Sequence, residues 1–263
     1  MTTQESFWLD DQEFGEVYYA LVAESLNICP ISWRSDLGAS NSKLHHFFQS
    51  VFGDNCSSED LPKYKKRKFR NDLATRKDGF PEVLSNWFDK VRKQYSNPAV
   101  SPIKGDKIAL VWNRRKKDPN GRNSTDESLR QLVKVCKKNG YTPVLVGDKV
   151  EEPKKLGFDF DLSNFHGNYK LNHIQQIAYL LKLIDGRPAF SIGLQSGGMD
   201  GLALFGGIPT IFLSKKKTAS NGMSALAKRI PYVFCWCEIQ YDGQFEKFDD
   251  QVLQAVDKKI HDY

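Results

Sequence analysis

The sequence predicts an α/β protein in which a Rossmann-like, parallel-sheet domain follows a smaller, helix-rich N-terminal domain. After residue 105, short apolar segments of strand type alternate with amphipathic helical segments. Before residue 105 the patterns are helical, at 13–26, 43–52 and 81–95, with few clear strands. Strands that alternate with helices at this spacing are typical of a parallel sheet covered on both faces.

A proline-punctuated segment separates the two parts. It runs Ser-Asn-Pro-Ala-Val-Ser-Pro-Ile-Lys-Gly-Asp from Ser96 to Asp106, and proline and glycine at this density mark a loop or linker. We therefore predict an N-terminal domain of residues 1–104 and a C-terminal domain of residues 105–263.

The first unit of the C-terminal domain has a strand, a helix and a second strand, predicted at 107–112, 124–139 and 141–146. Thr125 is the expected N-cap of the helix, and Gly140 the residue that ends it. The helix places four apolar residues on one face: Leu129, Leu132, Val133 and Cys136.

A loop at 158–165 precedes the remaining elements. Helices are predicted at 171–183, 199–205 and 248–260, and strands at 189–192, 210–213 and 232–239. The buried stripe of the first of these helices is expected to comprise Ile174, Ile177, Ala178 and Leu181.

The turn between the strand at 189–192 and the helix at 199–205 is the most informative feature. It contains Ser196, Gly197 and Gly198. Backbone N–H groups at a helix N-terminus favour an anion, and ligands of open α/β sheets bind at the carboxyl ends of strands. The turn is therefore interpreted as a phosphate cradle, although glycines here also serve close strand–helix packing. Neither the dinucleotide fingerprint nor the P-loop pattern is present.

The charge balance is modestly positive, with 38 Lys and Arg against 32 Asp and Glu. Basic clusters lie at 63–70, 114–117 and 215–217, which suit nucleic acid, a phosphorylated ligand, or simply solvated surface. No nucleic-acid-binding motif accompanies them, so nucleic acid is not the expected partner.

No apolar run reaches the roughly 20 residues that span a bilayer, and the N-terminus lacks the layout of a signal peptide. A cytoplasmic protein is therefore expected. The 5 cysteines have no Cys-x-x-Cys spacing, so reduced thiols are expected and a metal site is not.

The C-terminal domain resembles the donor-binding half of GT-B glycosyltransferases. Its segment Gln195-Ser-Gly-Gly-Met-Asp-Gly-Leu-Ala, followed by Gly207-Ile-Pro, is similar to the heptosyltransferase-type pattern Asp-Ser-Gly-x-x-His-x-Ala with a later Gly-x-Pro. Gln195 stands at the position of its Asp, and Asp200 at the position of its His. Val111-Trp-Asn-Arg-Arg-Lys-Lys-Asp also resembles the Arg-Arg pair of fucosyltransferases that use GDP-fucose.

The resemblance implies a metal-independent, inverting enzyme without a cofactor, which moves a sugar from a nucleotide-diphosphate sugar to a glycan or other hydroxyl acceptor. The fucosyltransferase likeness slightly favours a GDP donor. A breaking glycosidic bond leaves negative charge on the diphosphate, and fixed donors must stabilise it. Arg114 or Arg115, together with Ser196, Gly197 and Gly198, would do so, although the arginine loop is equally compatible with ordinary surface.

Asp148 follows the second strand and is expected either to accept from ribose hydroxyls or to cap a turn. The base that deprotonates the acceptor is expected in the N-terminal half, and the residues eligible there are Asp10, Asp11, Glu13, Asp36, His45 and His46. Asp11 is chosen among them because it lies beside Phe14-Gly15, at an expected loop-to-helix transition.

Two other functions remain open at this stage. A nucleotide-sugar epimerase of the same fold would turn over its substrate without an acceptor. A non-catalytic nucleotide- or sugar-binding protein derived from a transferase would also account for Gln195 and Asp200, where the pattern has Asp and His.

Overall fold

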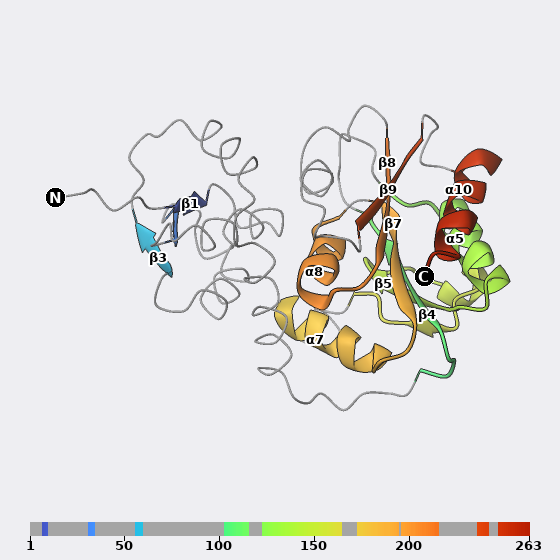
Figure 1. The fold of residues 1–263 in the computed structure, drawn as a ribbon, viewed down its shortest axis with the longest axis horizontal. Helices are drawn as coiled ribbons and strands as arrows, with labels where there is room; N and C mark the ends of the chain where they lie inside the picture. The colour runs from blue at the N-terminus through green and yellow to red at the C-terminus, as the bar shows by residue number, and fades with distance from the viewer. Residues whose placement is uncertain are drawn as a thin grey trace.

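The computed structural model describes residues 7–9, 31–34, 56–59, 103–115, 123–164, 173–194, 196–215, 236–241 and 247–263 (Figure 1). The helices predicted at 13–26, 43–52 and 81–95 lie outside these residues. The described part of the N-terminal region forms a three-stranded parallel sheet in the order β1-β2-β3. Its strands are β1 Phe7–Leu9, β2 Ile31–Arg34 and β3 Cys56–Glu59.

The C-terminal region is built on a six-stranded sheet in which every described pairing is parallel. Its spatial order is β6-β5-β4-β7-β8-β9. The strands are β4 Ile108–Asn113, β5 Thr142–Gly147, β6 Phe160–Asp161, β7 Ala189–Leu194, β8 Thr210–Lys215 and β9 Trp236–Tyr241. This order, with the first strand in the middle and the fourth beside it, is that of the Rossmann fold. The predicted α/β fold class is therefore confirmed.

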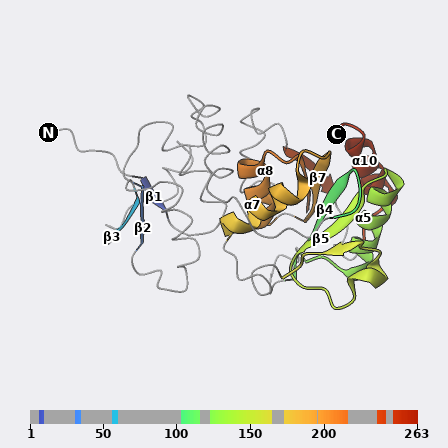
Figure 2. The same ribbon diagram turned by 90° about the horizontal axis from the view of Figure 1, so that it is seen from below.

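Helices cover both faces of this sheet. They are α5 Asp126–Lys138, α7 His173–Ile184, α8 Gly197–Gly206 and α10 Asp250–Ile260, with a short 3-10 helix, η4, at Pro153–Leu156. Figures 1 and 2 show α7 and α8 on one side of the sheet and α5 and α10 on the other. This layering follows from right-handed crossovers between parallel strands.

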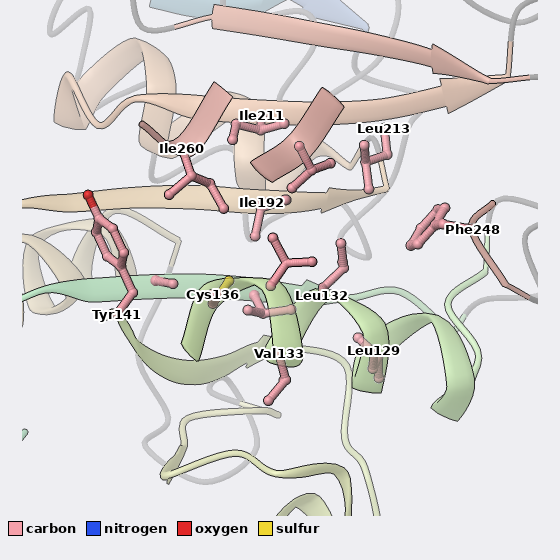
Figure 3. Packing of buried hydrophobic residues seen from close by; sticks show 14 of the residues in the cluster. Leu129, Leu132, Val133, Cys136, Tyr141, Ile192, Ile211, Leu213, Phe248 and Ile260 are labelled. Carbon is pink, nitrogen blue, oxygen red and sulfur yellow. The ribbon is translucent and has the colours of Figure 1, made fainter. Parts of the chain in front are cut away.

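The main described core lies between the sheet and the α5–α10 layer (Figure 3). Alternate residues of β4, β7 and β8 face this layer, since side chains along a strand alternate between faces. Phe190, fully buried, has Tyr141 edge-on with ring centroids 4.7 Å apart and Tyr263 stacked at 6.4 Å. The core includes all four residues predicted for the α5 face: Leu129, Leu132, Val133 and Cys136.

The ends of α5 follow their predicted capping. The Thr125 hydroxyl accepts from the Ser128 backbone N–H, and the Ser128 hydroxyl accepts from the Thr125 N–H, which makes a reciprocal capping box. Asn139 is the C-cap, and Gly140 follows with a positive φ of 77°. Local sequence therefore determines both ends of this helix.

Polar contacts attach α10 to α5. The Gln131 side chain donates to the Phe248 carbonyl at 2.9 Å and accepts from the Phe248 N–H at 2.7 Å. Asp257 accepts from the Lys138 ammonium at 2.6 Å and from the Asn139 amide at 2.7 Å. These contacts join residues more than a hundred positions apart and hold the C-terminal helix on the first helix of the domain.

One arginine binds the segment that leads into β4. Arg187, just after α7, donates to the carbonyls of Ile103 at 2.8 Å and Gly105 at 2.9 Å. The same side chain also donates to the Ile184 carbonyl at 3.0 Å and to that of Leu183. The chain that leads into β4 is thus bound to the end of α7. The boundary between residues 104 and 105 stays a prediction.

Two details differ from the sequence-based expectations. The segment predicted as a loop at 158–165 contains β6, which is too short for a periodic signal. Leu181 is only half-buried, whereas residues 176–180 and Leu183 are all buried. The described part of α7 is therefore covered over more than the single stripe that periodicity predicted. No described helix is both long and apolar enough to cross a membrane.

We expect Asp257→Asn to lower the free energy of unfolding by about 0.2–1 kcal/mol near neutral pH, the usual range for a partly exposed ion pair. The hydrogen bonds from Lys138 and Asn139 lower the pKa of Asp257 below its ordinary value of 3.8. Its contribution is therefore present above that pH and is lost as the pH falls through the lower pKa of the folded state.

Chemical denaturation of both proteins between pH 2 and pH 7 tests this prediction. Asp159→Asn, which removes an ion pair between Lys137 and a more exposed carboxylate, is the matched control. A difference between wild type and D257N that grows towards low pH would contradict it.

Cys136 is expected to be inert to thiol reagents in the folded protein. Complete burial raises the pKa of its thiol to about 12, and only the thiolate reacts. A thiol-disulfide reagent should therefore titrate equal numbers of native thiols in wild type and Cys136→Ala. In denaturant the variant should show one fewer than the 5 thiols of the wild type. One fewer native thiol in the variant would show that Cys136 is accessible.

Candidate functional site

The strand order reverses direction between β4 and β7. From β4 the chain moves outward through β5 to β6, and it returns through α7 to β7 on the other side of β4. Trp112 and Gly193 are paired residues near the carboxyl ends of the two strands. In open α/β sheets, ligands bind in the crevice outside such a reversal point. The loops after β4 and after β7, which carry most of the predicted site residues, leave the sheet on its two sides.

Ser196 lies at this reversal point as the N-cap residue of α8. Its backbone is extended, and its side chain makes no capping hydrogen bond. Its Oγ atom is buried and has no hydrogen-bond partner within the described part of the chain. Gly197 and Gly198 form the first turn of α8, where N–H groups lack acceptors within the helix. The turn therefore places a hydroxyl that has no described partner beside the backbone N–H groups that begin the helix.

Gly198 also has a packing role. A Cβ atom on Gly198 would lie 2.5 Å from Cζ3 and 2.7 Å from Cη2 of the Trp112 ring. On Gly193, a Cβ atom would lie 2.8 Å from both Cβ and the carbonyl oxygen of the same tryptophan. Close packing, the alternative explanation of the glycines in this segment, is therefore confirmed for Gly198. Packing does not account for the buried Ser196 hydroxyl.

The backbone of Arg114 is fixed where it leaves β4. Its N–H donates to the Ser124 hydroxyl at 3.1 Å, and its carbonyl accepts from the Ser124 N–H at 2.8 Å. The two bonds close the base of the loop between β4 and α5. Arg114 is half-buried and Arg115 is exposed, so the two residues of the predicted arginine pair differ in environment.

The guanidinium of Arg115 forms an ion pair with the carboxylate of Asp126, the first residue of α5. The pair is solvent-exposed, with 37% of the Arg115 side chain and 54% of the Asp126 side chain accessible. Exposed pairs of this kind contribute little free energy. An anionic ligand could therefore replace Asp126 as the partner of Arg115 at small cost.

Asp148, predicted either to hold a ribose or to cap a turn, joins the ends of β4 and β5. Its carboxylate accepts from the Arg115 backbone N–H at 2.6 Å. Its own backbone N–H donates to the Asn113 carbonyl at 3.0 Å, and its carbonyl accepts from the Asn113 side-chain amide at 2.7 Å. The turn-stabilising role has direct support in these contacts. Ribose binding stays a prediction.

Sequence analysis missed two residues of this arrangement. Asn113 is 3% exposed at the end of β4, and its Oδ1 has no hydrogen-bond partner in the described part of the chain. Gly147 has a φ of 90°, and a Cβ atom there would lie 2.2 Å from the Asn113 carbonyl oxygen. Two features of the sequence could have indicated these residues. Asn113 is a polar residue at the end of an apolar strand, and Gly147 is a glycine at the end of the next strand.

The structure leaves the other predicted site residues undetermined. Gln195 and the proposed base Asp11 lie outside the described residues, as do the clusters at 63–70 and 116–117. Asp200 lies within α8, one turn after Ser196, and only its backbone is described.

Metal-independent transfer was predicted partly on the absence of an Asp-x-Asp sequence, and this was wrong, because Asp159-Phe160-Asp161 is one. Its last two residues form β6 at the edge of the sheet, two strands away from β4. Asp159 pairs with Lys137 at 3.0 Å, and the Asp161 carboxylate accepts from the Ser163 N–H at 2.8 Å. Within the described ranges, no group of three His, Cys, Asp or Glu residues is placed to hold a metal ion.

Solved structures similar to this chain include three glycosyltransferases. A glycosyl transferase family 9 protein from Veillonella parvula DSM 2008 matches with 12% identity and a TM-score of 0.48, over 98% of this chain and 97% of that one. The E. coli heptosyltransferase WaaC with ADP matches with 12% identity and a TM-score of 0.44, over 98% of this chain and 73% of the other.

The third structure is the E. coli ADP-heptose LPS heptosyltransferase II, with 10% identity and a TM-score of 0.44, over 95% of this chain and 80% of that one. No protein-family model matches the sequence. No curated protein matches it either.

We expect Gly147→Ala to destabilise the protein more than Gly140→Ala. Both glycines have positive φ values, of 90° and 77°, and alanine in that region costs about 1–2 kcal/mol. A methyl group at Gly140 meets open space, whereas at Gly147 it collides with the Asn113 carbonyl. Denaturant unfolding of both variants measures the difference. Equal losses of stability would show that β4 and β5 separate easily at this end.

Proposed function

We propose that this protein is a glycosyltransferase that moves a sugar from a nucleotide-diphosphate sugar to an acceptor hydroxyl. The observation that carries the proposal is the position of Ser196: an N-cap hydroxyl with no partner among the described residues, at the point where the strand order reverses. A diphosphate bound there would accept from the Ser196 hydroxyl and from the first N–H groups of α8. The helix dipole would favour its negative charge.

The leaving nucleoside diphosphate gains negative charge as the glycosidic bond breaks, and donors fixed in advance lower the energy of that transition state. Arg114 is the better candidate for direct phosphate contact because its backbone is fixed at the end of β4, next to β7. Arg115 would contribute by exchanging its exposed partner Asp126 for a phosphate oxygen. Transfer of this kind uses fixed donors in place of a divalent cation.

The donor nucleotide and the acceptor are the finer parts of the proposal. The arginine pair favours GDP by resemblance, whereas one structurally similar protein is described with ADP. Both nucleotides therefore belong in the first experiment. Asp11 remains the proposed base for an inverting reaction, in which it would take the proton of the acceptor hydroxyl as that oxygen attacks the sugar.

The first experiment is isothermal titration calorimetry of the wild-type protein with UDP, GDP, ADP and CMP. We expect selective binding of one nucleotide. Ser196→Ala and Arg114→Ala should each weaken it about tenfold, which is what one charge-assisted hydrogen bond is worth. Arg130→Ala is the matched control, because Arg130 is an exposed arginine paired with a carboxylate on α5. Its affinity should equal that of the wild type.

Wild-type protein that binds none of the four nucleotides would overturn the proposal. Equal effects of S196A and R130A would remove the Ser196 turn as the binding site. Transfer is then tested by incubating the corresponding nucleotide sugar with and without hydroxyl acceptors. Turnover of the donor without an acceptor would indicate an epimerase, and tight binding with no turnover would indicate a binding protein.

A further inference from the structure

We infer that Trp112 is a positioning residue that sets where the first turn of α8 lies relative to β4. This inference rests on the proposed function, in which the first turn of α8 is the diphosphate site.

The Trp112 indole fits beneath the start of α8 because two neighbouring residues have no side chain. Trp112 is 5% exposed. Gly193, its paired residue on β7, leaves room for its Cβ and carbonyl oxygen, and Gly198 leaves room for the far edge of its ring. The ring therefore lies between the sheet and the first turn of the helix.

Shape, and not a hydrogen bond, holds this ring. The indole N–H is buried and has no hydrogen-bond partner among the residues that the structure describes. The separations that a Cβ on Gly198 would have, 2.5 and 2.7 Å, are far below van der Waals contact. The backbone of α8 thus rests directly on the ring, and a wide, rigid aromatic surface fixes its distance from β4.

The functional consequence follows from where the contact is made. Gly198 is two residues after Ser196, in the turn whose N–H groups are proposed to meet the phosphate. We expect a methyl group at Gly198 to push the turn away from the Trp112 ring, because the ring is only 5% exposed and has little room to move. The N–H groups and the Ser196 hydroxyl would move with the turn, and hydrogen bonds lose strength quickly when their geometry changes.

The test is a pair of double-mutant cycles with matched geometry. The first combines Gly198→Ala with Trp112→Leu, which removes the ring atoms that a methyl group on Gly198 would meet. The second combines Gly193→Ala with Trp112→Leu. This pair is the control, because a methyl group on Gly193 would meet the Cβ and carbonyl oxygen of residue 112, which leucine keeps.

Affinity for GDP and ADP is measured by calorimetry well below each variant's melting temperature. We expect G198A to weaken nucleotide binding about tenfold in the wild-type background, the effect of one displaced charge-assisted hydrogen bond. In the W112L background, G198A should change affinity by less than about twofold, since the collision is gone. G193A should not be rescued by W112L.

Hydrogen exchange of the peptide that covers α8 is measured on the same proteins without nucleotide. G198A should raise exchange of the N–H groups that bond back to the carbonyls of the first turn, and W112L should cancel this effect of G198A but not any effect of G193A. Trp112→Phe, a milder change, replaces W112L if the leucine variant does not fold.

The outcomes separate the two proposals. Wild type that binds neither GDP nor ADP overturns the proposed function for those donors, while the exchange data still decide whether Trp112 positions the turn. Unchanged exchange and affinity in G198A would overturn the inference. So would equal effects of G198A with and without Trp112, because the methyl group would then act through something other than the ring.

Discussion

The close approach of β4 to both of its neighbours at its carboxyl end is the constraint on which the rest of the site depends. On one side, Gly147 of β5 faces the Asn113 carbonyl at a distance that leaves no space for a side chain. On the other, a side chain on Gly193 of β7 would collide with Trp112 in the same way. Three parallel strands therefore end together, and the loops that follow them converge on one edge of the sheet.

Two different sets of interactions fix the loops at that edge. The β5 side is polar. There Asp148 bonds to the backbone carbonyl and the side-chain amide of Asn113, and its carboxylate accepts from the Arg115 backbone N–H. The β7 side is apolar, where the start of α8 rests on an indole ring. Between them, the Ser196 hydroxyl and the side-chain amide oxygen Oδ1 of Asn113 are buried polar atoms that no described residue hydrogen-bonds. Buried polar groups are normally satisfied, so ligand or solvent is their expected partner.

The elements of the C-terminal domain were largely predictable from sequence because each carries a local signal. The capping box at Thr125 and the glycine after Asn139 determine α5 without reference to the rest of the chain. The strands are short apolar runs between turns, as expected of a sheet covered on both faces. β6 was missed because two residues give no periodicity, and the extensive burial of α7 was missed because a hydrophobic stripe does not tell how much of a helix its neighbours cover.

In the C-terminal region, the sequence by itself determined the described strands and helices other than β6 and η4, and that a serine-glycine turn and an arginine pair each follow a strand. Those features depend on neighbours within a few residues. Only the tertiary structure decided that β4 and β7 are adjacent, that Arg115 pairs with Asp126, that Asp148 joins two strand ends, and that Gly198 makes room for Trp112. Each of these joins residues from separate elements, and such contacts arise from packing in three dimensions, which leaves no periodic trace in the chain.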